Sequence, residues 1–130
     1  MERVGRLGRK RRLGRYRVRR IDHLMQRGDI VSVDLEPVRG AEASKRRAAV
    51  VVSNDGANRA LDRVQVVPLT SKTAKIYPGQ ALVVVDGRQS QAMADRIGTV
   101  SKLRLRGDIG ALEPADTAAV DRAILTQLAL

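Results

Sequence analysis

The 130-residue sequence contains no cysteine, no tryptophan and no phenylalanine, and it has only two tyrosines and one histidine. Without cysteine, disulfides and thiolate metal sites are excluded. The single histidine, His23, rules out acid–base catalysis by a histidine pair and leaves too few ligands for a histidine-based metal cluster. The longest uninterrupted apolar run is about five residues, too short to span a membrane.

The apolar residues that remain are chiefly Val, Ile, Leu and Ala, and at this length they must fill the core of one domain. Side chains branched at Cβ pack well on a pleated sheet, so we expect a mainly β fold with a C-terminal helix (α+β). Pro114 suits the first position of that helix, and Val120, Ala123, Ile124 and Leu128 form one apolar stripe along it. Strands are expected over residues 30–35, 48–52, 64–69, 81–85, 90–96 and 108–112, a loop or single helical turn over 54–61, and a helical turn over 101–106.

Two of the expected strands carry a further signal. Residues 48–52 are apolar on both sides of the strand, which places that strand in the middle of the sheet. Asp86 and Gly87 follow the strand at 81–85 and predict a tight hairpin.

Positive charge is concentrated at the N-terminus. Of the formal net charge of +11, residues 1–24 contribute +8 from ten Lys/Arg and two Asp/Glu. Like charges at this density repel and no regular period persists, so we expect this segment to be disordered. It fits three interpretations: a basic arm that binds RNA phosphates, a targeting peptide without the apolar core of a secretory signal, or a segment outside the native protein. We favour the last, with Met25 as the true start and residues 25–130 as the domain.

Residues 46–70 combine two buried-strand patterns with polar residues at their ends. Arg47 enters the first strand and Thr70 leaves the second, so their side chains could meet at one point on the sheet rim. A guanidinium group is a planar, permanently charged fork that suits phosphate, and a threonine hydroxyl can add one hydrogen bond beside it. Each residue alone also has a plainer interpretation, as a solvated arginine and as a hydroxyl that caps its own turn.

Three motifs occur in order: RGDIVSVDLEPVRG at 27–40, RRAAVVVSND at 46–55 and VVPLTS at 66–71. With the C-terminal helix, they make residues 25–130 resemble the MazF/PemK toxins, the endoribonuclease halves of bacterial toxin–antitoxin pairs. The resemblance implies a small SH3-like antiparallel barrel of the MazF/CcdB toxin type, paired as a homodimer. It also implies sequence-specific cleavage of single-stranded mRNA without a metal or other cofactor, giving 2′,3′-cyclic phosphate and 5′-hydroxyl ends.

The resemblance assigns roles by position in the motifs. Arg47 takes the place of the family's catalytic arginine, and Thr70 takes the place of its catalytic threonine. Glu42 falls where many members have a loop glutamate that is sometimes assigned a part in proton transfer. The sequence departs from the family at Gly98, which replaces an arginine, although Arg96 supplies another arginine nearby.

The loops between the expected strands supply candidate RNA contacts through charge and hydrogen bonds. These candidates are Arg39, Gly40, Ser53, Asn54, Ser71 and Lys72. Ser53 and Asn54 fit an Asx turn equally well, and the charged candidates also fit solvated loop residues.

The resemblance also implies partners and a location. The partners are single-stranded RNA, a cognate MazE-like antitoxin whose flexible tail covers the RNA groove, and a second copy of the chain, in the cytoplasm and without membrane contact. Two other classes of function stay open. One is a CcdB-like toxin that inhibits a protein such as DNA gyrase and does not need Arg47, and the other is a non-catalytic RNA-binding module that depends on residues 1–24.

Overall fold

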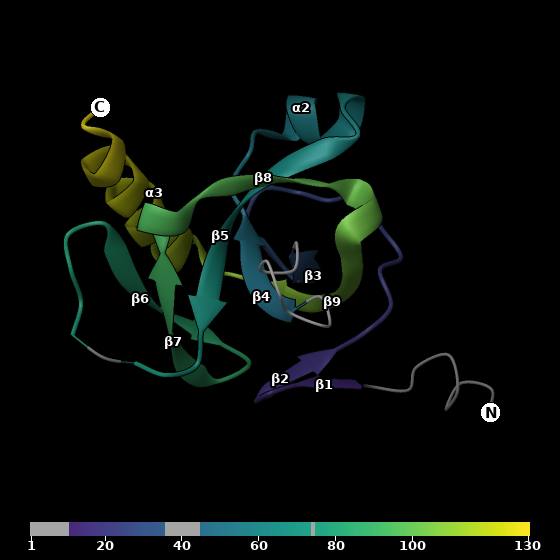
Figure 1. The fold of residues 1–130 in the computed structure, drawn as a ribbon, viewed down its shortest axis with the longest axis horizontal. Coiled ribbons are helices and arrows are strands. Elements are labelled where there is room, and N and C mark those ends of the chain that lie inside the picture. The colour runs from purple at the N-terminus through teal and green to yellow at the C-terminus, as the bar shows by residue number, and fades with distance from the viewer. Residues whose placement is uncertain (1–10, 36–44, 74) are drawn as a thin grey trace, which may run out of the picture.

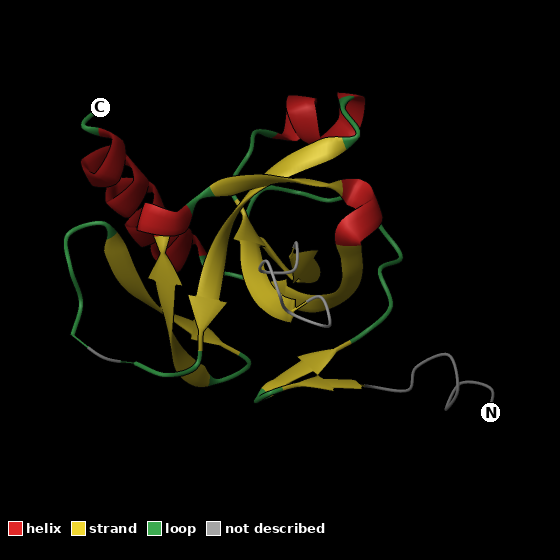
Figure 2. Ribbon diagram, viewed as in Figure 1, coloured by secondary structure: helices red, strands yellow, loops and turns green. Residues whose placement is uncertain are grey.

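The computed structural model describes residues 11–35, 45–73 and 75–130. This part of the chain is mainly antiparallel β-structure followed by a 15-residue C-terminal helix, which confirms the expected fold class (Figures 1 and 2). The strands are β1 (Arg11–Leu13), β2 (Tyr16–Val18), β3 (Asp29–Leu35), β4 (Lys45–Val51), β5 (Arg63–Thr70), β6 (Gln80–Val85), β7 (Arg88–Met93), β8 (Gly98–Ser101) and β9 (Leu105–Ala111). The helices are α2 (Asp55–Ala60) and α3 (Pro114–Leu128), and the 3-10 turns are η1 (Ala94–Arg96) and η2 (Lys102–Arg104).

The main sheet is ordered β6-β7-β5-β4-β3-β9, and β8 pairs with β5 beside this path. β5 changes partner along its length: it pairs first with β8, then with β4, and at its last two residues with β7. Because β5 pairs with three neighbouring strands, the sheet is strongly curved, as Figure 1 shows. β4 lies between β3 and β5, so the central position predicted for the strand at 48–52 is confirmed.

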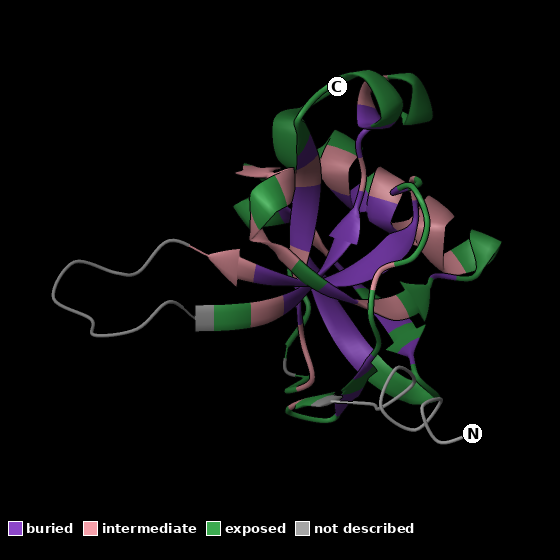
Figure 3. Cartoon of the chain, turned by 90° about the vertical axis from the view of Figure 1, so that its right-hand side faces the viewer, coloured by how far each residue is buried: buried purple, intermediate pink, exposed green. Residues whose placement is uncertain are grey.

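The middle of the sheet is buried on both faces, which explains why the central strand is apolar on both sides. Ala48 and Val50 belong to one core cluster, which also contains Val120 of α3. Ala49 and Val51 point the other way and belong to a second cluster on the opposite face of β4. In Figure 3 the buried parts of the chain, in purple, gather at the centre of the sheet.

Helix α3 covers the outer side of the first cluster and contacts β6. Pro114 is its first residue, as predicted. Val120 and Ala123 are buried and Ile124 is partly buried, whereas Leu128 is 49% exposed. The apolar stripe therefore packs over its first part and emerges into solvent near the C-terminus. Within the described residues, no helix is long and apolar enough to cross a membrane.

The turns follow the sequence signals closely. Asp86 and Gly87 have φ values of 54° and 79°, the left-handed pair that a type I′ hairpin requires between β6 and β7. α2 is the short helical turn expected after β4, and the Asn54 side chain caps it by accepting from the Ala57 amide at 2.8 Å.

Two expectations for the region after β7 are corrected. The strand expected over 90–96 ends at Met93, because residues 94–96 form the 3-10 turn η1, closed by the Ile97 amide on the Ala94 carbonyl at 3.1 Å. The chain then enters β8, which no strand pattern predicted because the segment Gly98–Ser101 is short and only partly buried. The helical turn and the edge strand that follow are present as η2 and β9, and β9 starts at Leu105 rather than at residue 108.

The expectation that residues 1–24 are disordered is wrong for the described part of that segment. β1 and β2 form a hairpin, and Tyr16 and Val18 are each only 6% exposed. The arginines obscure a two-residue alternation in which the apolar side chains face the core and the charged ones face solvent. Met25 is also buried, in the second core cluster, and its assignment as the true start stays a prediction.

Candidate active site

Arg47 lies near the start of β4, opposite Val33 of β3. Its neighbour Arg46 points to the other side of the strand, where its Nε donates to Asp34 Oδ1 at 2.9 Å. The Arg47 side chain is partly exposed, and it forms no hydrogen bond or ion pair with any residue in the described ranges. Its guanidinium group is therefore available to an anion.

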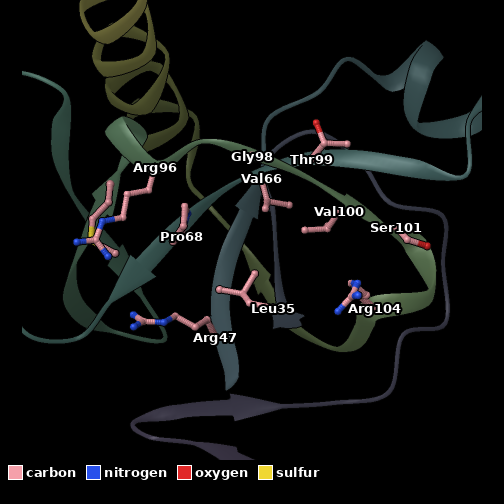
Figure 4. Close-up of a pocket in the computed structure, with 11 residues that line it drawn as sticks. Leu35, Arg47, Val66, Pro68, Arg96, Gly98, Thr99, Val100, Ser101 and Arg104 are labelled. Carbon is pink, nitrogen blue, oxygen red and sulfur yellow. The ribbon is translucent and has the colours of Figure 1, made fainter. Parts of the chain in front are cut away.

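The Arg47 side chain lines a pocket of about 800 Å³. Figure 4 shows Arg47 and Arg96 on one side of this pocket and Arg104 on the opposite side. The described lining residues are Leu35, Arg47, Val66, Pro68, Met93, Arg96, Gly98, Thr99, Val100, Ser101 and Arg104. Three arginines thus share an otherwise apolar and hydroxyl-bearing wall, and the described lining contains no carboxylate. Such a surface attracts anions.

The two turns that flank β8 place the second and third arginines. Arg96 ends η1, just before β8, and Arg104 ends η2, just after it. The hydroxyl of Ser101 starts the second turn by accepting from the Leu103 amide at 3.1 Å. Arg104 is held near the pocket partly by donating from Nη1 to the Asp34 carbonyl at 3.4 Å.

Thr70 is the last residue of β5, two residues beyond Pro68, which lines the pocket. Ala49 of β4 is paired with Pro68, and the same antiparallel register, if continued by two residues, would set Arg47 opposite Thr70. The Thr70 Oγ1 accepts from the Lys72 amide at 3.2 Å, which leaves its hydroxyl proton available to donate. The pairing of β4 with β5 itself ends at Ala49 and Pro68, and Thr70 pairs with Gln91 of β7 and is not among the residues that line the pocket, so the meeting of Arg47 and Thr70 stays a prediction.

The remaining predicted site residues fall into three groups. Ser71 and Lys72 directly follow Thr70, and Lys72 is exposed. Arg39, Gly40 and Glu42 belong to residues 36–44, which join β3 to β4 and lie outside the described residues.

Ser53 and Asn54 lie just beyond the opposite end of β4 from Arg47. Ser53 is buried, and its Oγ donates to Asn58 and accepts from the Gln65 amide at 3.1 Å. Asn54 is the cap of α2. Both side chains hold the β4–α2–β5 connection together, so the structure separates them from the pocket, and the Asx-turn interpretation describes their contacts.

Sequence patterns identify Arg96 only as a departure from the family and do not single out Arg104. One weak signal is present: Lys102, Arg104 and Arg106 alternate with leucines, which places basic side chains around a turn. Nothing in that pattern shows that the turn packs against β3, because the contact depends on the curvature of the sheet. Within the described residues, no group of three or more His, Cys, Asp or Glu could hold a metal ion.

Asp34 braces one side of the site. Its carboxylate accepts from Arg46 Nε at 2.9 Å and from Arg106 Nε at 2.6 Å, which ties β3 to both neighbouring strands. Burial by itself would raise the pKa of the Asp34 carboxyl, but the hydrogen bonds from Arg106 and Arg46 outweigh it, so this pKa lies below its ordinary value.

Acid should destabilise the protein partly through Asp34. Because the folded-state pKa is below the unfolded value of about 3.9, the stabilisation is complete above that value and is lost as pH falls through the folded pKa. We expect Asp34→Asn to be less stable than the wild type at pH 7, with the difference shrinking towards pH 2. Urea midpoints across this range measure it, and a difference that stays constant with pH would contradict the assignment.

Comparison with known proteins places the chain in a family. Residues 26–128 match the PemK-like, MazF-like toxins of type II toxin–antitoxin systems. Endoribonuclease MazF9 from Mycobacterium tuberculosis is 42% identical over 116 residues, covering 82% of this chain and 98% of that protein. An endoribonuclease from a mycobacterial species, solved with its cognate antitoxin, has a TM-score of 0.69 at 28% identity, covering 82% of this chain and 96% of the other. MazF from Deinococcus radiodurans shares the fold, with a TM-score of 0.69 at 24% identity and coverage of 84% and 100%. The chain belongs to the PemK/MazF-like toxins of type II toxin–antitoxin systems.

Proposed function

We propose that this chain is the toxin of a type II pair and an endoribonuclease that cleaves single-stranded RNA in the pocket beside Arg47. One relative from Mycobacterium tuberculosis and one from a mycobacterial species are named endoribonucleases. The observation that carries the proposal is the arrangement of Arg47, Arg96 and Arg104 around one pocket whose described lining has no carboxylate. This surface fits a phosphodiester backbone, because its three guanidinium groups attract phosphate and the described lining has no carboxylate to repel it.

RNA carries its own nucleophile, so the protein needs to position it and to stabilise charge. The 2′-oxygen attacks the adjacent phosphorus and loses its proton, the bond from phosphorus to the 5′-oxygen breaks, and that oxygen leaves as a 5′-hydroxyl after taking up a proton. The other product ends in a 2′,3′-cyclic phosphate. In this scheme the Arg47 fork binds the non-bridging oxygens, on which negative charge grows in the transition state.

Other residues have supporting roles in the scheme. Thr70 donates a hydrogen bond to a phosphate oxygen or to the 2′-hydroxyl, and Arg96 and Arg104 hold the phosphates on either side. An arginine is too basic to act as the general base, so Glu42 is our candidate for the proton acceptor. The scheme uses no metal ion.

We also propose the partners that the family resemblance implies: a second copy of the chain and a cognate MazE-like antitoxin. A mycobacterial endoribonuclease was solved with its cognate antitoxin, and Deinococcus radiodurans MazF was solved as a MazE–MazF complex. These complexes support an antitoxin for this chain, and the family resemblance implies that its flexible tail covers the RNA groove.

The full-length chain incubated with a long single-stranded RNA in EDTA tests this function. We expect discrete cuts that primer extension maps to a short repeated motif. An intact RNA after incubation with folded protein, with or without added Mg²⁺, would overturn the proposal. Inhibition of DNA gyrase by the same preparation, unaffected by Arg47→Ala, would then support the CcdB-like alternative.

A further inference from the structure

The segment before residue 26 lies outside the family match, yet part of it packs against the domain. Gly14, with φ of 61°, opens the two-residue turn between β1 and β2, as glycine does in a II′ hairpin. Leu13 and Tyr16 pack on the first core cluster, and Ile21 packs on the second. The hairpin is thus part of the folded body and lies across one end of the sheet in Figure 1.

Polar contacts fix the hairpin at both of its ends. The Tyr16 hydroxyl lies 3.1 Å from Ser90 Oγ of β7, and the Arg17 amide donates to Asp86 Oδ2 at 3.3 Å in the β6–β7 turn. At the other end, Arg19 and Asp108 exchange two backbone hydrogen bonds of 2.7 and 2.6 Å, which form an isolated β-bridge at the edge of β9.

Close approach at Gly107 makes this docking specific. A Cβ atom at this position would collide with the Val18 side chain and would lie 2.8 Å from the Arg19 carbonyl oxygen. The φ of Gly107 is outside the left-handed region, so the missing side chain serves the docked segment and not a backbone turn.

Docking the apolar face leaves a row of arginines in solvent. Arg17 and Arg19 alternate with the buried Tyr16 and Val18, so their side chains project from the opposite face about 6.6 Å apart, and Arg15 is exposed in the turn before β2. Arg12 and Arg20 are also exposed. Within the described residues, only Arg17 of this group forms an ion pair, with Asp86 at 3.5 Å.

The row lies next to the candidate active site. β1 contacts β4, the strand that carries Arg47, and Figure 4 shows the hairpin passing beside the Arg47 side of the pocket. Ser90, which contacts Tyr16, directly precedes Gln91, the cross-strand partner of Thr70. The positive surface of the pocket and that of the hairpin therefore adjoin.

We propose that residues 12–20 form a second binding surface for the backbone of single-stranded RNA, which extends the substrate contact beyond the pocket of Arg47. The proposal rests on the proposed function for the identity of the polyanion. Its position beside a carboxylate-free pocket favours RNA over an acidic protein segment, because one strand can contact both surfaces. A docked hairpin also presents its arginines without first having to be ordered, so more of their interaction energy appears as affinity.

A charge-neutralised variant tests the proposal: Arg15→Gln/Arg19→Gln/Arg20→Gln, which spares every docking side chain named above. The matched control, Arg59→Gln/Arg63→Gln/Arg122→Gln, removes the same charge from exposed arginines on α2, β5 and α3. The probe is a fluorescent single-stranded 2′-O-methyl RNA, which has no free nucleophile. Anisotropy titrations at several salt concentrations measure the dissociation constant and its salt dependence.

Losing three phosphate contacts should reduce the slope of log K against log salt by about 2 and weaken binding about tenfold at 50 mM salt. The control should change the slope by less than about 0.5, because its arginines lie away from the strand. On cleavable RNA, the hairpin variant should raise KM with little change in kcat. Equal effects of the two variants, or no effect of the hairpin variant, would overturn the proposal.

Gly107→Ala provides an independent variant, because it displaces the hairpin without removing charge. We expect weaker binding to the probe and faster trypsin cleavage after Arg15, Arg17 and Arg19. Faster trypsin cleavage with unchanged probe binding would overturn the need for docking.

If the wild type cleaves RNA but the hairpin variant binds normally, this proposal fails and the nuclease stands. If the hairpin variant shows the expected change of slope relative to the wild type but the wild type never cleaves RNA, the nuclease fails and this surface stands. If the hairpin variant lost binding to an acidic peptide but bound the RNA probe as the wild type does, the surface would belong to a protein partner and the RNA assignment would be overturned.

Discussion

Arg47→Ala should lower the rate constant of RNA cleavage by about 10³-fold or more, because it removes the donors that face the developing charge on phosphate. The fold should survive, since the side chain is partly exposed and forms no ion pair within the described chain. Arg47→Lys should also be strongly impaired, because an ammonium group keeps the charge but cannot donate in the paired geometry of the fork. Single-turnover cleavage of a defined RNA measures both effects.

Arg59→Ala is the matched control for this experiment. Arg59 lies on α2, is exposed, and carries the same charge away from the pocket. It should cleave RNA within about twofold of the wild type, as expected for a solvated surface arginine. Equal losses in Arg59→Ala and Arg47→Ala would show that general charge, and not the position of Arg47, determines the activity.

Asn58→Ala should lower the free energy of unfolding by about 3 kcal/mol, a large effect for a residue outside the candidate active site. The Asn58 side chain is fully buried, accepts from Ser53 Oγ and donates to the Ser53 carbonyl at 2.9 Å. Its own carbonyl accepts from Lys102 Nζ, which links α2 to η2. Alanine would leave the buried Ser53 groups without these partners. Urea unfolding with an unchanged m-value measures the effect.

Asn54→Ala separates this structural role from RNA recognition. As a helix cap, Asn54 should contribute about 1 kcal/mol to stability, and its loss should leave the dissociation constant for RNA unchanged. Weaker RNA binding by Asn54→Ala at full stability would restore the base-reading role that its sequence position allows. If Asn58→Ala is as stable as the wild type, the buried network does not hold the connection as described.

Local patterns predicted the parts of this fold that local physics determines. The two-sided apolar run at 48–52 identified the central strand, and Asp86-Gly87 identified a type I′ turn, because both depend on neighbouring residues alone. The pairing of the strands that carry Arg47 and Thr70 is also present, and the meeting of the two side chains stays a prediction.

The remaining features depend on contacts between residues that are distant in the sequence. Arg96 and Arg104 reach one pocket because η1 and η2 bend the chain on either side of β8, a strand too short to show a pattern. The N-terminal hairpin was hidden because the free energy of burying Tyr16 and Val18 depends on a partner surface at Gly107, nearly ninety residues later. Charge density alone therefore led to the wrong expectation that the described part of this segment is disordered.

The central claim is that the protein cleaves RNA through the RNA's own 2′-hydroxyl, aligned in the pocket of Arg47 without a metal ion. The most direct measurement uses two short RNAs in EDTA that span a mapped cut and differ only in one 2′-deoxy nucleotide on its 5′ side. The unmodified RNA should be cut to a 2′,3′-cyclic phosphate and a 5′-hydroxyl, both identified by mass, and the 2′-deoxy RNA should remain intact. Cleavage of the 2′-deoxy RNA at the same position, or products that carry a 5′-phosphate, would contradict the claim.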